Sequence, residues 1–136
     1  MLEFGSGGST VFWAKNCKSV KSYETSPEWL DKVKTRVRRY GNTEVLLLER
    51  NQALEKINSE PDNFYDIVLI DSYPKDIERI IIANASMSKL KKNGYLIIDN
   101  YQKFGMEKFI YPPWDVYTFD ELRYSGRGTR ICIKTS

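Results

Sequence analysis

Three short stretches of the chain are apolar at nearly every position, and they restrict the possible folds more than any other feature. Residues 45–48, 67–70 and 95–98 read VLLL, IVLI and YLII. A strand that is apolar on both faces is typical of the middle of a parallel sheet, because helices then cover it on both sides. Stretches with a helical spacing of apolar residues lie between these runs. We therefore expect an α/β fold in which strands and helices alternate.

The remaining elements fit the same architecture. A helix over residues 27–40 is predicted because Ser26 can cap it, Pro27 stands in its first turn and Gly41 ends it. A second long helix is predicted over residues 76–92. Two shorter helices and four further strands are expected: helices over residues 10–17 and 52–58, and strands just before Gly5 and over residues 19–24, 116–119 and 129–135. The last two strands predict an antiparallel hairpin at the edge of the sheet.

Composition excludes several classes of protein. The 136 residues show no internal repeat, so residues 1–136 are expected to form a single domain. No apolar stretch approaches the roughly 18 residues of a membrane span, which predicts a cytoplasmic protein that contacts no membrane. The net charge of +3 is too small to indicate a nucleic-acid binder by itself. Cys17 and Cys132 lack metal-binding or redox spacing and are expected to be free, buried thiols.

The stretch LEFGSGGST, which opens the chain, predicts a ligand site. A strand, a glycine turn and a helix follow one another there, and α/β sheets bind ligands where such turns leave the strands. Gly5, Gly7 and Gly8 allow positive φ angles and close approach of a ligand to the backbone. Glu24 ends the next strand, nineteen positions after Gly5, where a carboxylate can accept both hydroxyls of a ribose. The pair of features indicates a nucleoside cofactor, whereas the glycines alone are also compatible with a plain tight turn.

Four motifs in order make the sequence resemble the class I S-adenosylmethionine-dependent methyltransferases. They are LEFGSGGST, YETSPEW, YDIVLIDS and LKKNGYLIIDN, and together they span nearly the whole chain. Thr10 stands where a dinucleotide-binding turn would carry its third glycine, which disfavours that alternative. The resemblance implies a Rossmann-like three-layer sandwich with a mostly parallel seven-stranded sheet and a C-terminal antiparallel hairpin. It also implies S-adenosylmethionine as cofactor, in a domain that lacks the family's N-terminal lid helices.

The resemblance assigns cofactor contacts to several residues. Glu3 and the turn of Gly5, Ser6 and Gly7 would face the methionine part of the cofactor. Glu24 would hold the ribose, and Thr25 and Trp29 would lie near the adenine. Asp71 would bind the cofactor from the end of the strand over residues 67–70.

Two strand ends are acidic and predict a second centre. Asp71 follows one apolar strand, and Asp99 with Asn100 follows the next, so their oxygens can converge at one edge of the sheet. This pattern is similar to that of catechol-type O-methyltransferases, in which an Asp and an Asp-Asn pair hold Mg²⁺ or Ca²⁺ and orient the acceptor oxygen. Lys75 would correspond to their catalytic lysine, displaced by Pro74. Alternatively, these residues cap a helix or end a strand through turn chemistry.

The acceptor is expected to be oxygen on a small molecule or a sugar-like substrate. The tetrapeptide at residues 71–74 is DSYP, which departs from the D/N-P-P-Y pattern of enzymes that methylate the amino groups of bases. Two alternatives remain: a nucleic-acid or protein methyltransferase that uses the basic residues of the helix over residues 27–40, and a non-catalytic cofactor-binding module. Trp13 and Trp114 near an uncovered end of the sheet predict a homo-oligomer.

Overall fold

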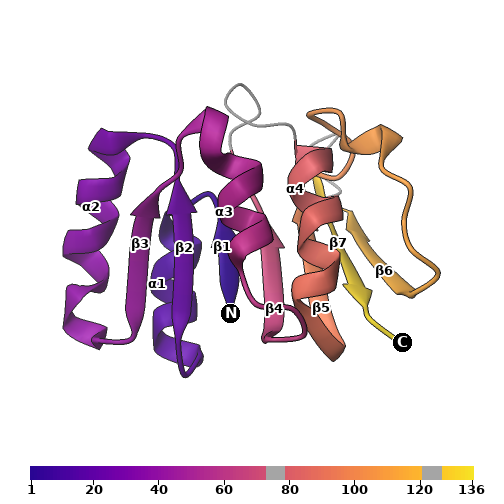
Figure 1. Ribbon diagram of the computed structural model, residues 1–136, viewed down its shortest axis with the longest axis horizontal. Coiled ribbons are helices and arrows are strands. Elements are labelled where there is room, and N and C mark those ends of the chain that lie inside the picture. Colours follow the sequence, from indigo (N-terminus) through magenta and orange to yellow (C-terminus); the bar gives the residue numbers. More distant parts are fainter. Residues whose placement is uncertain (73–78, 121–126) are drawn as a thin grey trace.

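The computed structural model describes residues 1–72, 79–120 and 127–136, with the side chain of Arg50 left aside. In this part of the chain, strands join into one sheet with the order β3-β2-β1-β4-β5-β7-β6 (Figure 1). The strands are β1 (Leu2–Phe4), β2 (Val20–Glu24), β3 (Thr43–Leu47), β4 (Tyr65–Ile70), β5 (Leu90–Asp99), β6 (Asp115–Asp120) and β7 (Gly128–Ile133). The strands β1 to β5 are parallel to one another, and β7 runs antiparallel to both β5 and β6. The predicted fold class is confirmed.

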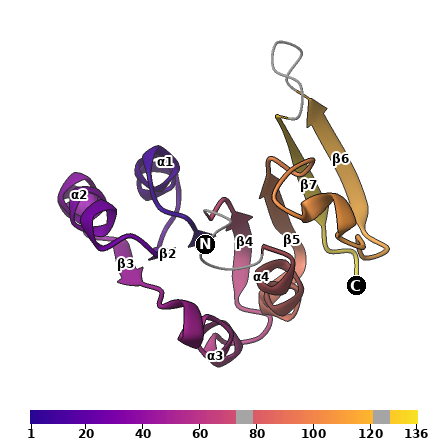
Figure 2. The same ribbon diagram turned by 90° about the horizontal axis from the view of Figure 1, so that it is seen from above.

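Helices cover the sheet on two sides and make three layers (Figure 2). On one face lie α1 (Gly8–Asn16) and α2 (Pro27–Val37), and on the other lie α3 (Ala53–Ser59) and α4 (Arg79–Ser86). Single 3-10 turns extend these elements or link them: η1 (Arg38–Tyr40), η2 (Arg50–Gln52), η3 (Met87–Lys89) and η4 (Met106–Lys108). None of the helices in the described part of the chain is both long enough and apolar enough to cross a bilayer.

The helix α2 forms where its capping residues predicted it. The Ser26 hydroxyl accepts a hydrogen bond from the backbone N–H of Trp29 at 3.3 Å, and Pro27 occupies the first turn, where its missing N–H costs nothing. Leu30, Val33 and Val37 are buried against the sheet. Each such burial stabilises the fold by roughly 1.5–3 kcal/mol. The η1 turn then carries the chain to Gly41, which ends the helix with a φ of +68°.

The helix predicted over residues 76–92 ends earlier than expected. Residues 76–78 lie outside the described part, α4 stops at Ser86, and β5 already begins at Leu90 beside Tyr65. Asn93 and Gly94, taken as a helix stop, instead form an irregularity inside β5. There Asn93 has a φ of +63°, and a Cβ at Gly94 would lie only 2.8 Å from the carbonyl oxygen of Lys91. Pairing with β4 therefore overrides the local helix signal.

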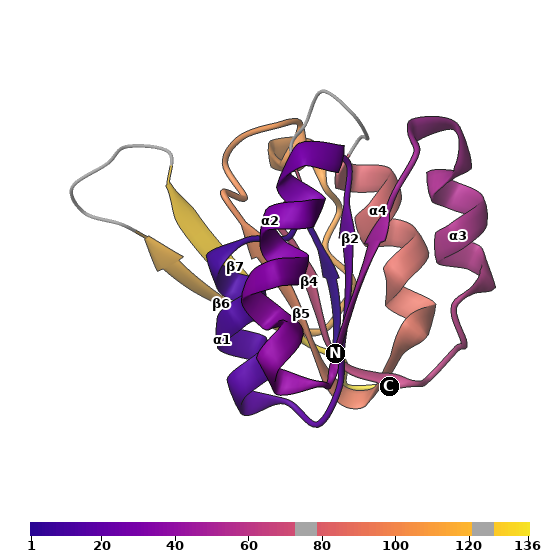
Figure 3. The same cartoon turned by 90° about the vertical axis from the view of Figure 1, so that its left-hand side faces the viewer.

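The runs over residues 67–70 and 95–98 lie on central strands, as predicted. The same prediction is wrong for residues 45–48, because β3 is an edge strand and Leu46 and Leu47 are only half-buried. Val68 and Ile70 on β4 and Leu96 and Ile98 on β5 are fully buried between the sheet and the helices α3 and α4. Cys132 is also buried and Cys17 is half-buried, and both are free thiols. The hairpin of β6 and β7 extends away from the helical layers (Figure 3). Its edge strand β6 is exposed at every position.

Candidate active site

The carboxyl ends of β1, β2 and β4 meet at the point where the strand order reverses direction. β1 lies between β2 and β4, with Phe4 opposite both Tyr23 and Ile70. Gly5, Glu24 and Asp71 therefore end or follow neighbouring strands at one edge of the sheet. In open α/β sheets this reversal point is the usual place for a ligand.

Gly5 makes the close approach of β1 and β4 possible. Its φ is +96°, and a Cβ at this position would lie 2.4 Å from the backbone oxygen of Asp71. Any other residue would clash there with backbone atoms. The other two glycines of the turn do not need positive φ, because Gly7 is extended with a φ of 172° and Gly8 begins α1. The expectation of special backbone geometry is thus met at Gly5 alone.

Glu24 reaches the glycine turn, as its predicted role requires. Its Oε2 accepts hydrogen bonds from the hydroxyl of Ser6 at 2.7 Å and from the backbone N–H of Ser6 at 3.1 Å. Its Oε1 accepts from the N–H groups of Thr25 and Ser26 at 2.9 and 3.0 Å. The side chain is largely buried. The carboxylate and the turn therefore lie on the same side of the sheet, and the carboxylate is already oriented to accept hydrogen bonds from hydroxyl groups.

Glu3 lies beneath the turn and holds it from inside the protein. Its carboxylate accepts hydrogen bonds of 2.6 Å each from the hydroxyls of Ser9, Thr10 and Ser22. Burial raises the pKa of Glu3, and the three hydroxyl donors oppose that rise. Thr10 in turn accepts the N–H of Gly7 at 2.8 Å. Glu3 thus fixes the start of α1, and its contact with the methionine part of a cofactor stays a prediction.

A cavity of about 310 Å³ opens over the turn. It is lined by residues of the turn, of the two strand ends and of α2: Gly5, Ser6, Gly7, Gly8, Ser9, Glu24, Trp29 and Asp71. The indole N–H of Trp29 donates to the carbonyl of Ser6 at 2.7 Å, so α2 closes one side of the cavity. Thr25 is connected to the site through its backbone N–H on Glu24. Most of the predicted cofactor residues are therefore brought together around one cavity.

Asp71 and Asp99 also come together, as their strand ends predicted. Their carboxyl groups are close enough to hydrogen-bond, and burial together with the negative charge of Asp99 raises the pKa of Asp71 to about 7. Asp99 further accepts the hydroxyl of Thr129 at 3.0 Å and the side-chain amide of Asn100. Lys75, the predicted base, lies outside the described residues.

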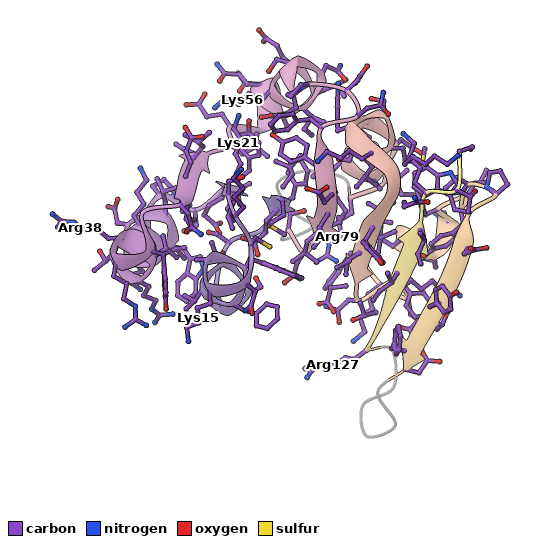
Figure 4. All side chains as sticks on the ribbon, turned by 90° about the horizontal axis from the view of Figure 1, so that it is seen from below. Lys15, Lys21, Arg38, Lys56, Arg79 and Arg127 are labelled. Carbon is purple, nitrogen blue, oxygen red and sulfur yellow. The ribbon has the colours of Figure 1, made fainter. Side chains whose placement is uncertain are left out.

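Arg79 is a member of this centre that sequence reasoning missed. It is the first residue of α4 and is 2% exposed, and it lies in the interior near β4 and β5 (Figure 4). Its Nε donates to the carbonyl of Ser72 at 2.7 Å, and its Nη1 donates to the carbonyl of Asp99 at 2.6 Å. Its Nη2 lies 3.6 Å from Oδ1 of Asp71. The signal in the sequence is an arginine placed directly before the apolar run of residues 80–83.

The residues predicted to hold a divalent cation do not fit one in this arrangement. A ligated ion needs free oxygens at roughly 2.0–2.6 Å, yet Asn100 turns its amide nitrogen toward Asp99. Two unit charges about 4 Å apart interact by roughly 4 kcal/mol at an effective dielectric constant of 20, so the guanidinium of Arg79 repels a cation beside Asp71. Within residues 1–72, 79–120 and 127–136, no group of three acidic or thiol side chains gathers as a metal site.

A second cavity of about 580 Å³ lies at Asp99. It is lined by the end of β5, the loop after it and the facing ends of β6 and β7: Asp99, Asn100, Lys103, Phe104, Phe119, Asp120, Arg127, Gly128 and Thr129. Asp71 lines the first cavity and Asp99 lines the second. One acid of the pair therefore lines each cavity.

Sequence comparison identifies a relative but no family. No family model matches the chain. An uncharacterised protein, L666 of Acanthamoeba polyphaga mimivirus, is 28% identical over 127 residues, which are 90% of this chain and 49% of the relative. The chain thus spans about half the length of that curated relative.

Solved structures agree over nearly the whole chain. An O-methyltransferase from Bacillus cereus in complex with SAH superposes with a TM-score of 0.81 at 17% identity, over 98% of this chain and 73% of that one. An rRNA methylase from Streptococcus thermophilus gives a TM-score of 0.75 at 18% identity, over 99% of this chain and 86% of that one. The chain therefore has the fold of the class I S-adenosylmethionine-dependent methyltransferases.

Proposed function

We propose that the protein is an S-adenosylmethionine-dependent methyltransferase acting on an oxygen of a small or sugar-like molecule. The observation that carries the proposal is the position of Glu24, whose carboxylate meets Ser6 of the glycine turn at 2.7 Å over a cavity. In the proposed complex, the ribose hydroxyls take the place of the Ser6 hydroxyl on Glu24. The similarity to a structure containing SAH supports this choice of cofactor.

The acceptor binds in the second cavity in this proposal. S-adenosylmethionine supplies an activated methyl group, and the chain's own task is to align acceptor and cofactor and to keep water out. Asp71 lines the first cavity beside Asp99, which lines the second, and its pKa of about 7 lets its carboxylate take the proton of an acceptor hydroxyl near neutral pH. Cation assistance through Asp71, Asp99 and Asn100 is implied by the resemblance alone, and the proposal does not include it, because these side chains do not fit a cation in this arrangement.

Calorimetry with SAH on the wild type and on Glu24→Ala tests the proposal. Two charge-assisted hydrogen bonds to a ribose contribute roughly 1.5–3 kcal/mol each, so we expect at least a roughly 100-fold loss of affinity in the variant. Glu28→Ala is the matched control, because Glu28 is an exposed acid in the first turn of α2. Thermal unfolding of each variant verifies that the fold is kept. A wild type that gives no heat with SAH would overturn the proposal.

Nucleic acid is a second candidate acceptor, favoured by the likeness to an rRNA methylase. The helix α1 and the η1 turn after α2 carry exposed cations, of which Lys15 and Arg38 are labelled in Figure 4. Binding to a short single-stranded RNA is the discriminating measurement. For a small-molecule enzyme we expect weak binding that nearly vanishes between about 50 and 200 mM salt. Tight binding at physiological salt, together with methylation of that RNA, would favour the second candidate.

The alternative of a non-catalytic module and two earlier predictions, self-association and a cytoplasmic location, are separate from this choice of acceptor. A non-catalytic module would bind SAH in the same calorimetry but transfer no methyl group. Self-association stays a prediction, and the side chains of Tyr117 and Phe119, more than half exposed on β6, support it. A cytoplasmic location likewise stays a prediction.

A further inference from the structure

The guanidinium of Arg79 is fixed beside the pair of Asp71 and Asp99 by contacts with four residues. It donates to the carbonyl oxygens of Ser72 and Asp99, faces the carboxylate of Asp71, and lies 4.7 Å from the ring centre of Phe104. Because the guanidinium is planar and always charged, these contacts leave it no other orientation. Arg79 therefore ties the ends of β4 and β5 together and brings a permanent positive charge to the acid pair.

Three of the four carboxylate oxygens of the pair already have partners. Oδ1 of Asp71 faces Arg79, Oδ1 of Asp99 accepts from Thr129, and Oδ2 of Asp99 accepts from the amide of Asn100. Mg²⁺ requires near-octahedral oxygen ligands at about 2.0–2.1 Å, and Ca²⁺ requires six to eight at about 2.3–2.6 Å. Either ion would have to displace these donors and also stand beside a buried cation.

We propose that Arg79 is a positioning residue that takes the place of a divalent cation, so that the pair of Asp71 and Asp99 works without a metal. The inference rests on the proposed function only in that the pair is where cofactor and acceptor meet. The guanidinium balances one of the two negative charges and holds both strand ends at a fixed separation. It does what an ion would do for alignment, but it leaves no open coordination position for the acceptor.

Titration of the protein with Mn²⁺, followed by electron paramagnetic resonance, tests this inference without cofactor or turnover. We expect the wild type to bind Mn²⁺ at this pair more weakly than about 1 mM. Arg79→Gln removes the charge but keeps amide donors for the backbone carbonyls, and it is expected to bind Mn²⁺ at least roughly tenfold more tightly. Arg79→Lys keeps the charge and is expected to behave like the wild type. Adding Asp71→Asn to Arg79→Gln should abolish the gained site.

The outcomes separate this inference from the proposed function. Tight Mn²⁺ binding by the wild type, below about 100 μM and lost in Asp71→Asn, would overturn the inference whatever the SAH calorimetry gives. Equal Mn²⁺ affinity of folded Arg79→Gln and Arg79→Lys would overturn it as well, because charge would then not decide the binding. Circular dichroism shows whether the variants fold, and if neither does, the wild-type and Asp71→Asn titrations decide. Failure of SAH binding, by contrast, bears only on the proposed function.

Discussion

The buried Glu60 and the half-buried pair of Asp71 and Asp99 lie at opposite ends of the sheet, and their partners differ in kind. At the amino end, Glu60 accepts hydrogen bonds from the phenols of Tyr23, at 2.6 Å, and Tyr65, and it forms an ion pair with Lys21 at 2.7 Å. Although burial opposes it, these three donors hold the pKa of Glu60 below its ordinary value. Burial and the neighbouring Glu60 raise the pKa values of both tyrosines, which stay protonated donors.

At the carboxyl end, two acids share one cation. Asp71 and Asp99 face each other with Arg79 as the charge that opposes their repulsion, and the pKa of Asp71 is raised to about 7. The phenols and the ammonium that satisfy Glu60 have no counterpart around Asp71 among the described residues. At the amino end of the sheet, Glu60 is therefore fully paired with donors. At the carboxyl end, Asp71 and Asp99 repel each other, and one cation opposes that repulsion.

This difference indicates where function lies. A buried carboxylate with three donors gains nothing from further ligands, whereas a carboxyl held near neutral pKa between two cavities can exchange a proton. Structural networks also perturb pKa values: the pKa of Glu60, which has the ammonium of Lys21 among its donors, is lowered, whereas the pKa of Glu3, held by three neutral hydroxyls, is raised. Glu60 and Asp71 thus differ in the direction of their pKa shifts and in exposure, since Glu60 is buried and 37% of the Asp71 side chain is exposed.

The largest effect on stability is expected for Glu60→Ala. The change leaves the phenols of Tyr23 and Tyr65 and the ammonium of Lys21 without their common acceptor, which costs about 3 kcal/mol in the free energy of unfolding. Urea denaturation measures this loss. SAH affinity of the folded variant should remain within a factor of two, because the cluster is remote from the glycine turn. Glu55→Ala, an exposed acid on α3, is the control and should cost roughly 0.5 kcal/mol or less. Equal losses in both variants would erase the distinction between the clusters.

The fold could be predicted because its signals are local and repeated. Apolar runs such as residues 67–70 need cover on both faces, and the cap at Ser26 and Pro27 marks the start of α2 wherever the chain goes. The end of α4 could not be predicted in the same way. Its limit depends on Leu90 pairing with Tyr65, a contact between residues that the sequence alone does not place side by side.

The residues of the candidate site likewise fall into those that the sequence predicted and those that depend on contacts made only in the folded protein. Gly5 and Glu24 lie on strand ends whose position follows from the order of elements, and the structure brings them to one cavity. Arg79 could not be assigned, because its role depends on the carbonyl groups of two strands and on a loop residue, Phe104. The inward orientation of Glu3 likewise depends on three hydroxyls that only folding collects.

A smaller effect, opposite in sign to the Glu60 effect, is expected for Asp71→Asn. The folded pKa of Asp71 is about 7, against an ordinary value of 3.8. Between these pH values the folded state binds more protons than the unfolded state, so stability falls as pH rises from about 4 to 7 and is constant above. Because 37% of the side chain is exposed, we allow for solvent screening and expect this group to cost about 1 kcal/mol at pH 8.

Urea denaturation at pH 5 and pH 8 measures that slope in the wild type and in the variant. Asp71→Asn should remove the slope and be more stable than the wild type at pH 8, since the amide avoids repulsion with Asp99. Glu60→Gln is expected to have a different effect. The lowered pKa of Glu60 contributes stability that is lost as pH falls, so removing this carboxyl group should flatten the acid side of the profile of stability against pH. If Asp71→Asn leaves the slope unchanged or destabilises the protein at pH 8, Asp71 and Asp99 do not repel each other in the folded protein. The assignment of Asp71 as the group that takes the acceptor's proton would then be wrong.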